Sequence, residues 1–232
     1  MILRYLFNGS LTGAEKLAYI LPQIAAVLVI IFLILPLHEL AHGFVSYKLG
    51  DSTAKRQGRL TFNPLASIDP IGALFILLFG FGWARPVPVN PGNFKNRRVG
   101  MALTALAGPV ANLLAALIGG LAYYGVLLLT GYMGPDWLYQ GIGFFVSINV
   151  SLAVFNLLPL PPLDGSKVLG AFLPAKIEMQ YYKYQRIIIP IIFVLLISGA
   201  LSTPLYYAQD ACLDGILWLA RLPYSLAGAW VF

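Results

Sequence analysis

Four apolar stretches of helical length alternate with shorter polar stretches along this chain. They cover about residues 17–47, 99–130, 138–158 and 187–206. A helix needs roughly 20 apolar residues to cross a bilayer, and each of these stretches meets that length. Only helices and closed barrels satisfy their backbone hydrogen bonds in lipid. The pattern therefore predicts an all-α polytopic membrane protein with about four to six transmembrane helices.

A further apolar stretch lies at 212–232, and Arg221 and Pro223 interrupt it. We expect a fifth span there, with a helix lying in the membrane interface as the alternative. Within the first span, Pro36 has no N–H to donate to the carbonyl of Phe32. A kink or a local opening of the helix is therefore predicted just before Pro36.

The stretch between the first two spans, 48–98, has a different pattern. Residues 51–61 are polar and basic and are flanked or interrupted by glycines, so we expect a short hairpin at the cytoplasmic interface. Residues 71–82 are apolar, but about a dozen residues are too few to span and are typical of a re-entrant or interfacial segment. Residues 83–92 contain three prolines and are expected to be extended.

The composition is that of a membrane protein. Of the 232 residues, 59% are hydrophobic and 10% are charged, and the mean hydropathy is +0.80; soluble domains carry about 25% charged residues. Cys212 is the single cysteine, which excludes a disulfide framework and a multi-cysteine metal site. No basic stretch is interleaved with aromatic residues, so no nucleic-acid partner is expected despite the net charge of +6. We expect residues 1–232 to form one membrane-embedded domain without an appended soluble domain, and the first span to be retained rather than removed as a signal peptide.

The basic residues predict an orientation in the membrane. Eight lysines and arginines lie in 48–98, and the loops 131–137 and 207–214 contain none. The loop after the third span is again basic, with Lys167, Lys176, Lys183 and Arg186. Because basic loops stay on the cytoplasmic side, we expect a multi-pass plasma-membrane protein whose N-terminus lies outside.

Two acidic residues, Glu39 and Asp164, stand out within the spans and their ends. Ionisable groups in a membrane are costly, so their presence favours a function. Glu39 lies in the motif HELAH, which contains both histidines of the chain, His38 and His42. On a helix, residues four apart share a face, so both imidazoles can reach one metal ion, while Glu39 is turned by about 100°. This is the HExxH arrangement of zinc peptidases, with Glu39 as the base; a hydrogen-bonded structural pair of histidines is the alternative.

A catalytic zinc usually has three protein ligands and one open position for water. With no further histidine and one remote cysteine, the third ligand must be an aspartate or a glutamate, and Asp164 is the best candidate. Asp164 lies three residues before Lys167, and His42 lies six residues before Lys48, so both are expected near the cytoplasmic side. The alternative is a carboxylate in a turn, where Asp-Gly is common.

The sequence resembles the bacterial-type site-2 protease family of intramembrane zinc metalloproteases. The blocks that carry the resemblance appear in order between residues 36 and 170, and their combination is far more specific than HExxH alone. They are HELAHG (38–43), KLGD (48–51), GRLTFNP (58–64), DPIG (69–72), RPVPVN (85–90), AGPVAN (107–112) and NLLPLPPLDG (156–165). The chain departs from the family in 63–69, which lacks an expected histidine that is not a proposed zinc ligand.

The resemblance implies one Zn²⁺ per chain, held by His38, His42 and Asp164, with Glu39 as the catalytic base. It also implies that Asn156 stabilises the oxyanion or orients substrate, and it suggests a substrate contact for Asn112. An interhelical hydrogen bond is the structural alternative for both asparagines.

The implied activity is regulated intramembrane proteolysis of membrane-protein substrates, which we expect to be single-span proteins cut from the cytoplasmic side. Three alternatives remain open. They are a zinc peptidase acting on prenylated tails or loose peptides, a catalytically silent membrane-binding or chaperone protein on the same scaffold, and a metal transporter. A transporter would normally carry several intramembrane His, Asp or Glu sites, and this chain has one cluster.

Overall fold

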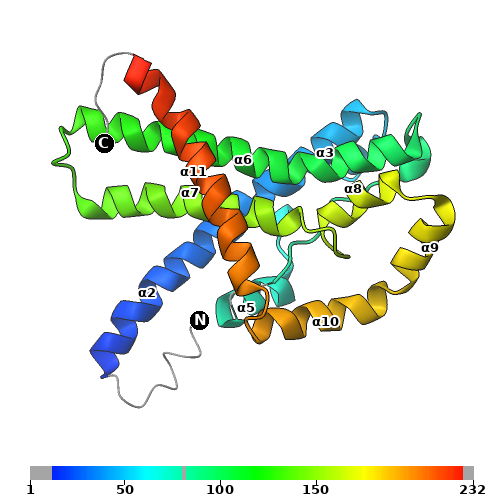
Figure 1. Ribbon diagram of the computed structural model, residues 1–232, viewed down its shortest axis with the longest axis horizontal. Helices are drawn as coiled ribbons and strands as arrows, with labels where there is room; N and C mark the ends of the chain where they lie inside the picture. The colour runs from blue at the N-terminus through cyan, green and yellow to red at the C-terminus, as the bar shows by residue number, and fades with distance from the viewer. Residues whose placement is uncertain (1–11, 80–81, 227–232) are drawn as a thin grey trace. The chain divides into compact units, whose positions relative to one another are not determined.

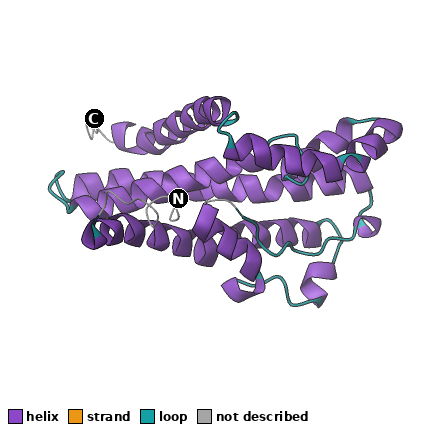
Figure 2. Ribbon diagram, turned by 90° about the horizontal axis from the view of Figure 1, so that it is seen from below, coloured by secondary structure: helices purple, strands orange, loops and turns teal. Residues whose placement is uncertain are grey.

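A computed structural model describes residues 12–79 and 82–226 and divides the chain into two compact units, 1–95 and 96–232. The described residues are helices joined by loops, without a strand (Figures 1 and 2). Three described helical stretches are long and apolar enough to cross a membrane: Ile24–Lys48, Arg97–Leu129 and Asp136–Asn156. The predicted all-α membrane architecture is therefore confirmed.

The first unit begins with an uninterrupted helical stretch, built from α2 (Gly13–Val29), a π-helical turn η1 (Ile30–Ile34) and α3 (Leu35–Lys48). In the π turn, the Leu35 N–H donates to the carbonyl of Ile30, five residues earlier. The turn directly precedes Pro36, which lacks the N–H that a regular helix would need. The predicted opening of the helix before Pro36 is confirmed.

Short elements follow in the first unit: α4 (Thr53–Arg56), the 3-10 turns η2 (Pro64–Ala66) and η3 (Pro91–Asn93), and α5 (Pro70–Phe79) between them. The predicted hairpin at 51–61 is wrong. The Asp51 carboxylate accepts a hydrogen bond from the Thr53 N–H, which favours a helical turn at this point. Gly58, with a φ of 66°, lies just beyond that turn.

The apolar segment is helical over α5, and its ten residues are too few to cross a bilayer, as predicted. Residues 82–90 contain neither helix nor strand, in agreement with the extended conformation that their prolines predict.

The second unit is built on α6 (Arg97–Leu129) and α7 (Asp136–Asn156), which lie side by side in Figures 1 and 2. A Cβ at Gly119 of α6 would lie 2.9 Å from the Val146 side chain of α7, so a glycine is needed for this close approach. Ala116, Val146 and Val150 form the buried core of the pair. These two helices match the predicted second and third spans.

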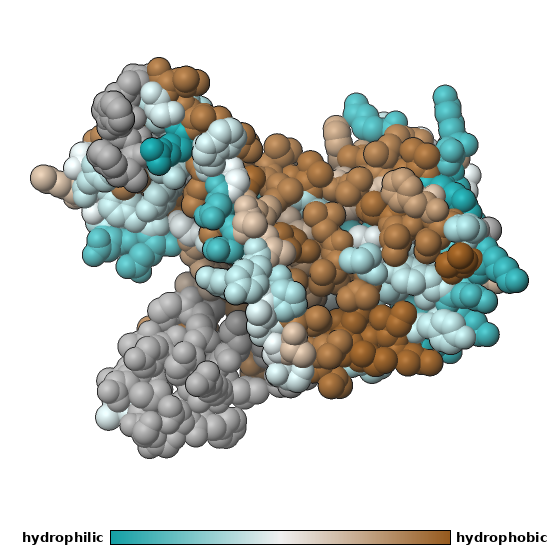
Figure 3. Space-filling view, in the orientation of Figure 1, coloured by the Kyte–Doolittle hydropathy of each residue, from teal (hydrophilic) through white to brown (hydrophobic). Residues whose placement is uncertain are grey.

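One face of α6 is apolar and exposed. Leu103, Val110, Leu114 and Ile118 recur every four or seven residues and are 44–66% exposed. Figure 3 shows that many apolar side chains are exposed on the face it draws. Such a stripe suits contact with lipid tails, because small and polar residues occupy the buried face of the same helix.

The rest of the second unit comprises α8 (Asp164–Phe172), α9 (Ala175–Lys183), α10 (Gln185–Ile197) and α11 (Ser202–Leu226). The predicted fourth span, 187–206, is wrong as one continuous helix. α10 has 13 residues, and Gly199, with a φ of 77°, separates it from α11.

The expected fifth span overlaps α11, a 25-residue helix that also includes Asp210 and Asp214. α11 is not among the three helices that meet the length and hydropathy of a span. Its Ala220 packs against Gly120 of α6. Residues 227–232 lie outside the described part of the chain.

Candidate metal centre

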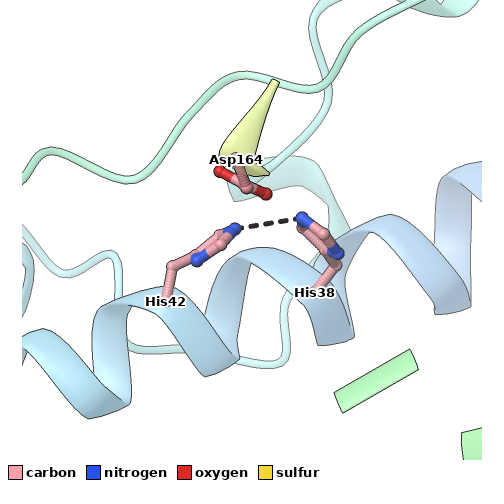
Figure 4. A group of neighbouring side chains, drawn as sticks. All are labelled: His38, His42 and Asp164. Atoms are coloured by element: carbon pink, nitrogen blue, oxygen red, sulfur yellow. Dashed lines mark hydrogen bonds between the residues drawn. The ribbon is translucent and has the colours of Figure 1, made fainter. Parts of the chain in front are cut away.

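The two histidines of α3 face each other across one helical turn. Both side chains are buried, with 5% of His38 and 8% of His42 exposed. Their Nε2 atoms are 3.0 Å apart, and the ring planes meet at 84° with centroids 4.6 Å apart. Figure 4 shows the two rings turned toward each other. The spacing of four residues thus brings two ring nitrogens close together on one helical face, as predicted.

This distance fits a shared metal ion. Zinc–nitrogen bonds of about 2.0–2.1 Å at tetrahedral angles place two ligand nitrogens about 3.3 Å apart. The observed separation of 3.0 Å is close to that value. The same separation fits a hydrogen bond between two neutral imidazoles, which is the structural alternative. Small movements of either ring therefore convert one arrangement into the other.

Glu39 is half-buried and does not share the face of the two histidines. Its Oε2 accepts a hydrogen bond of 2.8 Å from the backbone N–H of Val87, in the extended segment 82–90. A hydrogen bond to one oxygen fixes the orientation of the carboxylate and leaves the second oxygen for other contacts. Glu39 thus has a defined orientation, which the sequence could not predict because Val87 lies 48 residues away.

Asp164 is the first residue of α8, and 6% of it is exposed. The Lys167 Nζ donates to its Oδ1 at 2.9 Å, and the N-terminus of a helix is itself favourable for a carboxylate. The preceding turn is tightly folded. A Cβ at Gly165 would lie 2.2 Å from the carbonyl oxygen of Leu157, so only glycine fits there.

The two predicted asparagines have different surroundings. Asn156 ends α7, and its Nδ2 donates to the carbonyl of Leu152 in the same helix at 2.9 Å. Asn112 of α6 is fully buried, and neither of its amide atoms has a hydrogen-bond partner among the described residues. The interhelical hydrogen bond that was the structural alternative for Asn112 is thus not found in the described part of the chain.

Asp51 is a buried acidic residue to which the sequence assigned no role. Its side chain is fully buried, and its carboxylate accepts hydrogen bonds from the N–H of Thr53, the N–H of Asn90 and the Nδ2 of Asn93. Burial by itself would raise the pKa of Asp51, but these hydrogen bonds outweigh it and lower the pKa to about 2. Two features of the sequence could have pointed to Asp51: it lies just after the first span, and it ends the block KLGD.

Comparison with known proteins gives a consistent set of relatives. The model of "Peptidase family M50" matches residues 133–199. Three relatives carry the name "Putative zinc metalloprotease": YwhC of Bacillus subtilis, Rip2 of Mycolicibacterium smegmatis and MJ0611 of Methanocaldococcus jannaschii. YwhC is 38% identical over 86% of this chain and 91% of its own length.

The other two relatives match less of their own length. Rip2 is 31% identical over 72% of this chain and 64% of its own length. MJ0611 is 34% identical over 57% of this chain and 62% of its own length. The comparison with solved structures gave no significant match.

Proposed function

Because the chain belongs to peptidase family M50, the site-2 protease family, we propose that it is an intramembrane zinc metalloendopeptidase. It hydrolyses peptide bonds in or near transmembrane segments of other membrane proteins. The observation that carries the proposal is the buried pair of imidazoles on α3, in a helix apolar enough to cross a membrane, with Glu39 beside it. A structural His-Glu-His cluster at that position would be expensive in lipid.

His38, His42 and Asp164 would hold the zinc ion. Two imidazoles and one carboxylate are a ligand set of catalytic zinc, which leaves a position for water. All three side chains are buried, two of them on α3 and the third at the start of α8. Figure 4 draws them. The Lys167 ammonium orients the Asp164 carboxylate, as residues that support metal ligands commonly do.

Zinc bound there supplies Lewis acidity, which polarises a peptide carbonyl and lowers the pKa of a water molecule. Glu39 accepts the proton of the attacking water and returns it to the leaving nitrogen. The Val87 N–H holds one oxygen of Glu39 in place for both transfers. The Asn156 amide stabilises negative charge on the substrate oxygen without adding a second buried charge. Asn112 contacts the substrate.

A substrate helix must unwind before it is cut, because its peptide groups are occupied by hydrogen bonds. In lipid each unpaired backbone group costs several kcal/mol, so the enzyme must supply water and new partners. We place the site toward the cytoplasmic side of the plasma membrane, near the basic loops, and expect single-span substrates to enter there. The extended part of segment 71–92 offers carbonyl oxygens to the N–H groups of the unwound substrate, without forming a full strand ladder; intact cleavage after deletion of 71–82 would count against this role.

Glu39→Gln tests the proposal directly. Glu178→Gln is the matched control, because it makes the same change on α9, where Glu178 forms a partly exposed ion pair with Arg98. Each variant is co-expressed with candidate single-span membrane proteins, and zinc content is measured on the purified protein. We expect Glu39→Gln to retain zinc and to lose at least about 100-fold in cleavage rate, the lower range for a general base. The control should match the wild type.

Undiminished cleavage by Glu39→Gln would refute the assigned base. Equal zinc content in the wild type and in His38→Ala would refute the metal centre. A wild-type protein that binds zinc and retains membrane proteins without cutting them would favour the silent binding protein.

A further inference from the structure

The Asp51 carboxylate joins three separate parts of the first unit. It lies just beyond the end of α3 and accepts hydrogen bonds from α4 through Thr53, and from the 90–93 region through the Asn90 N–H and the Asn93 Nδ2. The last two bonds are both 2.7 Å long, which is at the short end for such bonds. They cross about 40 residues of sequence, so they fix tertiary structure rather than a local turn.

Asp51 makes these contacts as a buried charge without a buried counter-ion. Its side chain has no exposed area, and no lysine or arginine pairs with it among the residues that the structure describes. Hydrogen-bond donors alone therefore compensate its charge. An amide at this position would bring its own donor against at least one of the existing donors, so the arrangement is specific for a carboxylate.

The segment that Asp51 holds is the one that binds the catalytic base. Val87 lies three residues before Asn90, and its N–H donates to Glu39. The same segment is held at its other end, where the Arg59 guanidinium donates to the carbonyl of Arg85 at 2.8 Å. The extended segment is therefore anchored at three points, which are Arg85, Val87 and Asn90. The middle point, Val87, is bonded to Glu39.

The Val87 side chain also packs closely against α3. A Cβ at Gly43 would lie 3.2 Å from the Val87 side chain and 3.0 Å from that of Leu60, so the glycine leaves just enough room for both. Val87 itself is 8% exposed. The segment therefore packs closely against the helix at Gly43, and loss of the anchor at Asn90 would allow it to move away.

We propose that Asp51 is a positioning residue for the reaction, because its hydrogen bonds to Asn90 and Asn93 hold the extended segment 82–90 where the Val87 N–H orients Glu39. This inference rests on the proposed function. Asp51 does not touch the substrate; it acts through Val87 on the direction of the Glu39 carboxylate. A shift of about 1 Å in a positioned group can lower a rate about 100-fold, so the effect is measurable.

The test compares the full-length, zinc-loaded wild type in detergent with Asp51→Asn and Asn93→Ala. Asp210→Asn is the matched control, since it makes the same change at an exposed position of α11. Amide hydrogen exchange is followed by mass spectrometry, and kcat and KM are measured on a cleavable substrate. Asn93→Ala covers the case in which Asp51→Asn fails to fold.

We expect faster exchange in peptides that cover 84–93, unchanged exchange in α6, and a kcat lowered about 10- to 100-fold with little change in KM. Asn93→Ala should show the same changes to a smaller extent, and Asp210→Asn should show none.

Wild-type exchange in 84–93 would overturn the inference, as would faster exchange there with unchanged kcat. Equally faster exchange in all peptides would assign Asp51 to general stability and would also overturn it. If the wild type cuts no substrate, the proposed function fails, and the catalytic part of this inference fails with it. The exchange result still decides whether Asp51 holds the segment.

Discussion

Replacing Gly165 with alanine should impair zinc binding more than it impairs folding. A Cβ at this position would lie 2.2 Å from the carbonyl oxygen of Leu157 and 2.5 Å from that of Leu158. Carbon and oxygen atoms in contact are normally about 3.3 Å apart or more. Both opposing atoms are backbone atoms, so no side chain can rotate away. The start of α8 must therefore move by about 1 Å relative to the end of α7.

That movement affects Asp164, which directly precedes Gly165. Changes that disturb the support of a metal ligand typically weaken metal binding by about 10- to 100-fold, and we expect a loss in that range. Overpacking in a folded protein costs about 1–3 kcal/mol, so Gly165→Ala should lower the free energy of unfolding by that amount and still fold.

The assay is competition with a chelating dye, which gives the zinc dissociation constant of the purified protein, together with the midpoint of thermal unfolding. Gly141→Ala is the matched control. Gly141 lies on α7, no atom lies within 4 Å of the Cβ that alanine would add, and the change should stabilise the helix by about 0.5–1 kcal/mol. Wild-type zinc affinity in Gly165→Ala would refute the reasoning that this glycine places Asp164 as a ligand.

Two further predictions follow from buried polar groups. The lowered pKa of Asp51, about 2 against an ordinary 3.8, corresponds to about 2 kcal/mol of stability that is complete above about pH 4 and is lost as the pH falls toward 2. The midpoint of thermal unfolding in detergent should therefore fall more steeply with decreasing pH over that range in the wild type than in Asp51→Asn. Equal slopes of midpoint against pH would contradict this. Asn112→Leu should raise the unfolding midpoint, because it removes amide atoms that lack partners among the described residues and that cost about 1–3 kcal/mol each. It should also slow cleavage, and an unchanged rate would remove Asn112 from the substrate site.

The long helices and the histidine pair were predictable from local pattern. An apolar run of sufficient length specifies a helix whatever surrounds it, and residues four apart always share a helical face. The opening before Pro36 was predictable for the same reason, because the missing N–H is a property of the residue itself.

The errors arose where a single residue or a distant partner decides the structure. The apolar run continues through Gly199, so residues 187–206 were predicted to form one span. In the structure this glycine separates two helices. The hairpin at 51–61 was predicted from polar residues and glycines, but the hydrogen bond from the Thr53 N–H to the Asp51 carboxylate favours a helical turn at the start of α4. The partners of Asp51 and Glu39 lie about 40 and 48 residues away, so no local pattern could reveal them.

The alternating prolines of the extended segment have a consequence for solubility. Pro86 and Pro88 have no N–H, and the N–H groups of Arg85 and Val87 are already bonded to Ser67 and to Glu39. Another strand that approached the segment would find carbonyl acceptors but few donors. Exposed extended backbone usually starts aggregation by pairing with a second strand in a regular ladder. Two copies of the protein cannot build such a ladder along this segment. The chain can keep an extended segment beside Glu39, the proposed catalytic base, without making that segment a nucleus for self-association.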